Sequence, residues 1–344
     1  MSSKKADVAE PVTRWSHGLA PDAVDMTTQL STLTLPNPLL TASGCAANGP
    51  ELGQFFDVSE LGAFVTKSVM LEPRSGRPTP RMAETPSGML NSIGLQGPGI
   101  DAFVDKDLPW LAERGARVVV SIAGGSVDEY AKIAQKLRGK PGLVMLEVNI
   151  SCPNVSDRGQ VFACNPRAAS SVIDAVRRAS TVPVFAKLSP DVTDIVEIAD
   201  ACVGAGAHGL SVINTLLGMA IDTDDLSPVL GGRTGGLSGP AIRPVAVRCV
   251  WQIHEAMPEV PILGMGGIRT GRDALEFVLA GASAVSVGTA VFGDPSAPLR
   301  VLSELQMLLA ERGFESLRDA IGYAHLPPDL RRVAHAMADP EEIV

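Results

Sequence analysis

The stretch Glu147-Val-Asn-Ile-Ser-Cys-Pro-Asn154 joins an apolar run to residues that can do chemistry. Residues 142–148 are typical of a fully buried strand, and the run ends abruptly in amide, hydroxyl and thiol side chains. The proline after Cys152 disfavours helical geometry at the cysteine, so we expect a turn or loop to present the thiol. Cys152 is therefore a candidate base, and a small buried cysteine in a turn is the alternative.

Lys67 and Lys187 each end an otherwise apolar strand. Their ammonium groups should point into a partly desolvated pocket, where each needs an anionic partner. A reduced flavin is one such partner, because its pyrimidine edge gains negative charge, and a substrate carboxylate is another. Ion pairing with Glu147 or Asp191 is the purely structural alternative.

Four asparagines offer a hydrogen-bond donor and an acceptor together, which suits a cyclic amide or imide ligand. They are Asn91, Asn149, Asn154 and Asn214. Asparagine is also common in turns, and that explanation stays open for each of them. Together with Cys152, they describe a small polar heterocycle held beside a base.

Glycines mark a candidate phosphate site in two places. Gly264-Met-Gly266-Gly267-Ile268 and Val287-Gly288-Thr289 follow the last two apolar strands. Bare backbone N–H groups can reach phosphate oxygens there because glycine has no side chain in the way. Two ordinary turns are the alternative, but the order of the two sites matches the phosphate site of many barrel enzymes.

The elements that must position these residues are short apolar runs alternating with amphipathic stretches, a pattern typical of β-α units. The expected strands are Leu39–Ala42, Ala63–Thr66, Arg117–Ile122, Leu143–Val148, Val182–Leu188, Gly209–Ile213, Pro261–Leu263 and Ala284–Val287. The expected helices include Ser126–Leu137, Pro166–Ser180, Thr193–Ala205, Ala241–Ala256 and Arg272–Ala280. Eight units predict a closed (β/α)₈ TIM barrel, with an open doubly wound sheet as the alternative.

Two connections are too long to be simple turns, namely 68–99 and 216–239. The first carries three arginines and Asn91, and the second is rich in glycine and aspartate. We expect both to fold over the C-terminal mouth of the barrel, where barrel active sites lie.

Composition restricts the class of protein. The formal net charge of −9, without a cluster of basic residues, argues against nucleic acid or an anionic membrane as a partner. Five cysteines without a C-x-x-C pair show no disulfide framework and no metal or iron–sulfur ligand set, so we expect a cytoplasmic protein without a metal site. The first 28 residues are polar and show no signal peptide, and no apolar run is long enough for a membrane helix.

With these residues identified, the chain resembles the dihydroorotate dehydrogenases from about Leu33 to Pro295. The motifs that carry the resemblance are Thr66-Lys67-Ser68, Asn91-Ser-Ile-Gly-Leu95, Asn149-Ile-Ser-Cys-Pro-Asn154, Lys187-Leu-Ser-Pro190, Asn214-Thr215, Gly235-Gly-Leu-Ser-Gly-Pro240, Gly266-Gly267 and Gly288-Thr289. The resemblance implies FMN-dependent oxidation of (S)-dihydroorotate to orotate in pyrimidine biosynthesis. Cys152 would take the C5 proton while hydride passes from C6 to N5 of FMN.

The family's binding residues carry over to matching positions of this chain. For the substrate, they imply Lys67, Asn91, Ile93, Gly94, Leu95, Asn149, Asn154, Asn214 and Thr215. For FMN, they imply Ala42, Ser43, Lys67, Ser68, Asn149, Lys187, Ile213, Gly239, Gly266, Gly267, Gly288 and Thr289, together with Ser121.

Cys152 also separates the classes of this family. Class 2 enzymes carry serine at that position and add an N-terminal membrane-binding segment, whereas classes 1A and 1B share the cysteine. The stretches Leu95-Gln-Gly-Pro-Gly99 and Leu237-Ser-Gly-Pro-Ala-Ile-Arg243 favour class 1B, the catalytic subunit that passes electrons to NAD through a partner containing FAD and an iron–sulfur cluster. The family also implies a homodimer, while fumarate or another electron acceptor stays open.

Three other functions remain open at this level: an FMN barrel acting on a pyrimidine such as uracil, an isomerase or lyase acting on a phosphorylated metabolite, and a non-catalytic flavin or metabolite sensor. The expected organisation is a flexible polar extension over residues 1–28, an FMN-binding barrel over 29–312 and a helical tail over 313–344.

Overall fold

The computed structural model describes residues 19–150 and 164–331, and its central feature is a sheet of eight parallel strands. In sheet order, these are β3 (Leu39–Thr41), β16 (Ala284–Val287), β15 (Ile262–Met265), β10 (Gly209–Val212), β9 (Val184–Leu188), β8 (Leu143–Asn149), β7 (Val118–Ile122) and β4 (Phe64–Val65). A parallel bridge between Leu40 and Ala63 joins the first strand to the last and closes the ring. The expected TIM barrel is therefore confirmed, strand by strand, and the open sheet is excluded.

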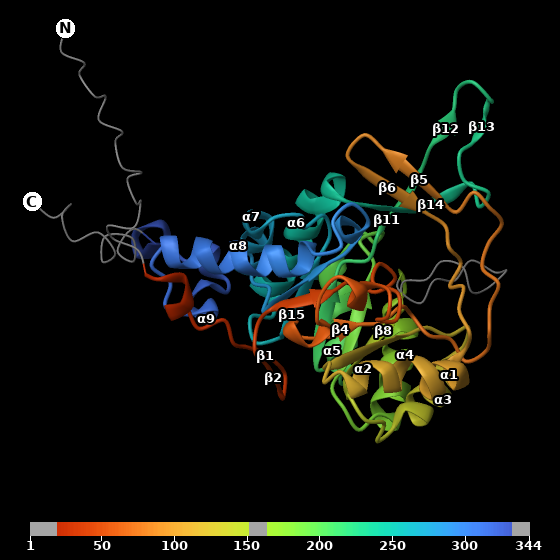
Figure 1. Cartoon of the computed structure of the whole chain (residues 1–344), viewed down its shortest axis with the longest axis horizontal. Coiled ribbons are helices and arrows are strands. Elements are labelled where there is room, and N and C mark those ends of the chain that lie inside the picture. The colour runs from red at the N-terminus through yellow and green to blue at the C-terminus, as the bar shows by residue number, and fades with distance from the viewer. Residues whose placement is uncertain (1–18, 151–163, 332–344) are drawn as a thin grey trace, which may run out of the picture.

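Helices lie around the outside of the barrel (Figure 1). They are α1 (Ile100–Ala102), α2 (Leu108–Glu113), α3 (Val127–Leu137), α4 (Pro166–Ala179), α5 (Ile195–Gly204), α6 (Arg243–Ala256), α7 (Gly271–Leu279) and α8 (Ala297–Glu311). Side chains cap several of these helices at their starts: Ser126 accepts a hydrogen bond from the backbone N–H of Glu129, and Asp194 accepts one from that of Val196. The five helices expected from periodicity are confirmed within two residues.

Apolar side chains fill the barrel interior at the N-terminal end of the strands. Met145, Phe185 and Leu263 pack there against Leu30 and Leu35 of a hairpin formed by β1 (Thr28–Leu30) and β2 (Leu33–Leu35). The Thr28 hydroxyl donates to the carbonyl of Ser283, immediately before β16, which fixes the hairpin at this end. The opposite end, where the strands finish in polar residues, remains for the site.

The two long connections contain strands that pair with each other. The first contributes β5 (Met82–Thr85) and β6 (Gly88–Asn91), and the second contributes β11 (Leu216–Met219) and β14 (Thr234–Ser238). They form one antiparallel sheet in the order β11-β14-β6-β5, and the hairpin of β12 (Ile221–Asp222) and β13 (Ser227–Pro228) projects beyond it (Figure 1). Sequence reasoning expected only connections here, because glycines and short alternation hide these strands.

Segments before and after the barrel lie side by side. A 3₁₀ turn at Pro21–Ala23 contacts α8, and Asp25 forms a parallel bridge with Ser316 just before α9 (Leu317–Ala320). Val24 and Met26 are buried, although they fall within the span expected to be a polar extension. No helix within residues 19–150 and 164–331 is long and apolar enough to cross a membrane.

Candidate functional site

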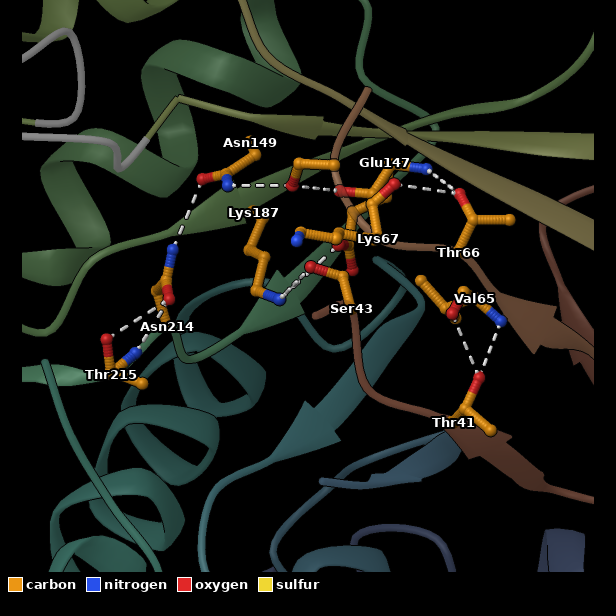
Figure 2. A network of polar contacts seen from close by, with 12 residues as sticks. Thr41, Ser43, Val65, Thr66, Lys67, Glu147, Asn149, Lys187, Asn214 and Thr215 are labelled. Atoms are coloured by element: carbon orange, nitrogen blue, oxygen red, sulfur yellow. Dashed lines mark hydrogen bonds and ion pairs between the residues drawn. The ribbon is translucent and has the colours of Figure 1, made fainter. Parts of the chain in front are cut away.

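Asn149, the last residue of β8, is the centre of a polar network at the mouth of the barrel (Figure 2). Its side-chain amide donates to Ser68 Oγ at 3.1 Å, and Ser68 lies 2.9 Å from the hydroxyl of Ser121. On its other side, Asn149 Oδ1 accepts from Asn214 Nδ2 at 3.2 Å. The ends of four strands or of the segments that follow them are thus tied together, as predicted from their common position in a barrel.

Lys187 reaches from β9 across the interior of the barrel. Its ammonium nitrogen lies 3.3 Å from Glu147 Oε1 and 3.4 Å from the hydroxyl of Ser43, which follows β3. Both members of the ion pair are buried. Of the two acids considered as partners, the lysine therefore selects Glu147, while Asp191 accepts from the backbone N–H of Leu217.

Lys67 is half-buried and has no carboxylate within ion-pair distance among the described residues. Burial lowers the pKa of its ammonium group, and the positive charge of Arg81 lowers that pKa further, while Glu51 opposes the shift. A small cavity beside Lys67 is lined by Asn48, Ser68 and Leu95, among others. A bound negative charge next to Lys67 would offset both causes of the shift, and the cavity there, of about 10 Å³, has room for about one water molecule.

Asn91 and the residues that follow it approach the mouth from the extra sheet. Asn91 Nδ2 donates to the carbonyl of Gly236 at 3.2 Å, which joins β6 to β14. Gly94 has φ +76°, and Leu95 has φ +56°, a conformation that is uncommon for a bulky side chain. The carbonyl of Ile93 accepts from the backbone N–H of Arg77 at 3.0 Å, which ties the segment 93–95 to the part of the first long connection that precedes β5.

Ile213, Asn214 and Thr215 directly follow β10, which ends at Val212. The peptide bond between Val212 and Ile213 is cis, and Asn214 Oδ1 accepts from the backbone N–H of Thr215 at 2.8 Å. Thr215 lies against Gly236, where a Cβ atom would come within 2.0 Å of Thr215 Oγ1. The extra sheet therefore sits directly over the end of this strand.

The glycines expected to hold phosphate lie in close-packed turns. Gly266 and Gly267 have φ +132° and +78°, and a Cβ on Gly267 would come within 2.6 Å of the carbonyl of Gly239. Gly288 lies beside Ala42, whose backbone N–H donates to the carbonyl of Val287. The turn at Gly267 thus packs against Gly239, the turn at Gly288 packs against Ala42, and only glycine fits at Gly267.

The predicted residue Thr289 and the unpredicted Cys45 lie next to Gly288. Thr289 starts a 3₁₀ turn, Thr289–Phe292, directly after Gly288. Cys45 also lies there, since its sulfur would be 3.4 Å from a Cβ on Gly288. Burial raises the pKa of the Cys45 thiol to about 11, with the charge of Lys187 opposing the shift. Cys45 is therefore a neutral thiol at physiological pH.

Two predicted residues, Cys152 and Asn154, lie outside the described residues. The chain leads toward them from Asn149 and Ile150 at the end of β8. Sequence reasoning missed Tyr130, which is buried on α3 and donates from its hydroxyl to the carbonyl of Asn149 at 2.7 Å. Only its place on the buried face of an amphipathic helix distinguished it in the sequence, and that signal indicates packing.

No group of three or more His, Cys, Asp or Glu side chains that could hold a metal ion occurs in the part of the chain that the structure describes. A larger cavity of about 840 Å³ lies at the opposite end of the barrel, lined by Thr28, His208, His254 and Arg318 among others. None of the predicted site residues borders it.

Comparison with known proteins finds relatives that match most of this chain. A family model described as dihydroorotate dehydrogenase matches residues 25–309. The dihydroorotate dehydrogenase B (NAD(+)), catalytic subunit, of Geotalea daltonii is 51% identical over 298 residues, which cover 87% of this chain and 97% of the relative. The protein of the same name from Desulforudis audaxviator is 53% identical over 293 residues, covering 85% and 95%. This chain therefore belongs to the dihydroorotate dehydrogenase family of flavin-dependent oxidoreductases.

Proposed function

We propose that the chain oxidises (S)-dihydroorotate to orotate with FMN as its cofactor, as the catalytic subunit of a class 1B enzyme. The observation that carries this proposal is the network around Asn149, in which Ser68 and Asn214 flank one amide at the end of a buried strand. Amide and hydroxyl groups arranged in this way match the alternating N–H and C=O groups of a dihydropyrimidine ring. Membership of the family excludes the isomerase or lyase alternative.

Lys67 supports a substrate with a carboxylate. Its lowered pKa reflects burial and the nearby charge of Arg81, and an anionic group would relieve both. Uracil, the alternative substrate, has no carboxylate to offer. Asn91 and the backbone of residues 93–95 would complete the binding of the ring from the extra sheet, because Asn91 is anchored there through Gly236.

The glycine cradle fits a flavin phosphate. Gly266, Gly267 and Gly288 come from turns after β15 and β16, and the positive φ angles and close contacts of the first two exclude side chains at those positions. When bound, FMN would supply the acceptor for the two electrons of the substrate. Lys187 would lie near the ring of the flavin and stabilise its reduced, negatively charged form, with Ser43 beside it.

Cys152 is proposed as the base that removes the C5 proton. It follows Asn149, the last residue of β8, by three positions in the sequence. A thiol needs a lowered pKa to act at neutral pH, and a cation such as Lys67 or Lys187 next to the thiol would favour the thiolate. Asn154 would join the substrate contacts from the same segment.

A second subunit is proposed as the route for electrons to NAD. The relatives are named catalytic subunits of NAD(+)-dependent enzymes, and they align over nearly their whole length. We propose a partner with FAD and an iron–sulfur cluster, and a homodimer of this chain as the core. The exposed apolar side chains on and beside the extra sheet are available for such contacts: Met82, Leu217, Met219, Ile221 and Leu226.

The decisive experiment is an anaerobic half-reaction with the chain purified alone. Addition of dihydroorotate should bleach the visible flavin band, and release of the cofactor by denaturation should yield FMN rather than FAD. Dihydrouracil in place of dihydroorotate is the matched control, and it should bleach the band far more slowly. A flavin that responds to dihydrouracil but not to dihydroorotate would refute the substrate, and a chain that takes up no FMN would refute the cofactor.

A further inference from the structure

We propose that Glu147 sets the reduction potential of the bound flavin by counterbalancing the charge of Lys187. The proposal rests on the proposed function, because it requires FMN at the mouth of the barrel. It assigns Glu147 the part of a positioning residue, which acts on the flavin through the lysine and does not itself touch the substrate.

The position of Glu147 follows from the alternation along β8. Met145 belongs to the interior cluster and Asn149 to the mouth, so Glu147, between them in the same alternation, also faces the inside of the barrel. Asn149 is in register with Lys187 on β9, and Glu147 lies two residues earlier along its strand. The carboxylate is therefore one layer below the side chains of the site.

Burial makes the charge of this carboxylate effective. The side chain of Glu147 has 0% exposure and that of Lys187 has 5%, at a distance of 3.3 Å between Oε1 and Nζ. Charges removed from water interact more strongly and are screened less by salt. A buried pair of this kind stabilises a fold only weakly compared with an apolar pair, so its presence calls for a second reason.

Only one oxygen of the Glu147 carboxylate has a hydrogen-bond partner among the described residues. Glu147 Oε2 accepts no hydrogen bond among the described residues. The hydroxyl of Ser211, which is in register with Lys187 on the other side, also has no partner there. With so few donors around it, the negative charge of Glu147 is compensated mainly by Lys187.

The influence of Lys187 extends to the loop that would carry the flavin. Its ammonium group lies 3.4 Å from Ser43 Oγ, and its charge acts on the Cys45 thiol beside Gly288. A reduced flavin carries a negative charge that the oxidised ring lacks, so Lys187 stabilises the reduced form. Glu147 opposes that effect from below and keeps the potential lower than the lysine alone would make it.

The test replaces the carboxylate by an amide of the same size. In Glu147→Gln, sulfite should bind the oxidised flavin at least tenfold more tightly, because its addition to the ring leaves the flavin negatively charged. The two-electron potential should also rise, by about 30 mV for each tenfold shift of the equilibrium between oxidised and reduced flavin. Both quantities are read from the flavin spectrum without turnover, by sulfite titration and by equilibration with a reference dye.

Two further variants keep the test decisive. Glu147→Asp retains the charge but withdraws it by one methylene from the ammonium group, and sulfite affinity should rise at least threefold even if the glutamine variant does not fold. Glu255→Gln, at an exposed position on α6, removes the same charge from the surface and should leave both quantities unchanged. Lower thermal stability with unaltered sulfite affinity and potential would show that Glu147 is only structural, whereas a wild-type chain without flavin would refute the proposed function itself.

Discussion

Replacing Lys67 by methionine should abolish the weakening of orotate binding at alkaline pH. Burial and Arg81 lower the pKa of Lys67 below its ordinary value of 10.5. The group is charged below that lowered pKa and becomes neutral as the pH rises through it. Binding of an anion such as orotate should therefore be tightest at low and neutral pH and should weaken on the alkaline side, beginning below pH 10.5.

The magnitude follows from the type of contact. A hydrogen bond to a charged partner contributes about 1.5–3 kcal/mol, so its loss corresponds to a roughly 10- to 150-fold weaker affinity for orotate. Lys67 is only partly exposed and forms no ion pair with a described carboxylate, so no other contact of the lysine has to be broken first. In Lys67→Met, we expect this loss of orotate affinity at neutral pH, and we expect the affinity to stay constant as the pH rises into the alkaline range.

The assay is a titration of the oxidised, FMN-loaded chain with orotate between pH 6 and about 10, followed through the change in the flavin spectrum. The carboxylate of orotate stays ionised over this range, so it contributes no slope of its own. Lys67→Arg is the matched control: it keeps the charge at every pH tested, since arginine does not deprotonate in this range, and should bind without the alkaline decrease.

Two outcomes would contradict this reasoning. If the methionine variant keeps the alkaline decrease, another group controls it and Lys67 does not face the ligand's carboxylate. If both variants bind orotate as tightly as the wild type, the cavity beside Lys67 and Leu95 is not the binding site for the anionic group. Loss of FMN from either variant would be detected in the same spectra.

Three further predictions concern the base, the phosphate cradle and the other thiols. Cys152→Ala should retain FMN but slow flavin reduction by dihydroorotate by roughly 100-fold or more, as measured by stopped flow, and an unchanged rate would remove Cys152 from the mechanism. Gly267→Ala should reduce the FMN content per chain, since its Cβ would meet the carbonyl of Gly239 at 2.6 Å, and full occupancy would argue against the cradle. Iodoacetamide at pH 8 should label exposed Cys164 well before half-buried Cys45, whose pKa is raised to about 11, as peptide mass spectrometry would reveal. Labelling in the reverse order would contradict the raised pKa of Cys45.

Local pattern was sufficient for the barrel strands and for most of the predicted mouth. A strand buried on both faces is mostly apolar, and polar residues such as Asn149 and Lys187 near its end lie where the barrel opens. The polar ends of eight such strands therefore predicted the barrel, and they predicted the end of it at which the candidate site residues lie. The glycines at 266 and 267 were expected to expose their backbone to a phosphate, and the structure adds that both have positive φ angles and that a Cβ on Gly267 would meet the carbonyl of Gly239.

Contacts between distant parts of the chain decided the pairing of the extra sheet and the partner of Lys187. The pairing of β6 with β14 joins residues far apart in sequence, such as Asn91 and Gly236, and neither segment has an apolar alternation strong enough to reveal it. The choice of Glu147 as the partner of Lys187 depended on barrel register, since sequence spacing left Asp191 equally plausible. Local hydrophobicity is enough to identify the strands. The partner of each side chain is fixed only when the sheet closes, because closure decides which strands are neighbours.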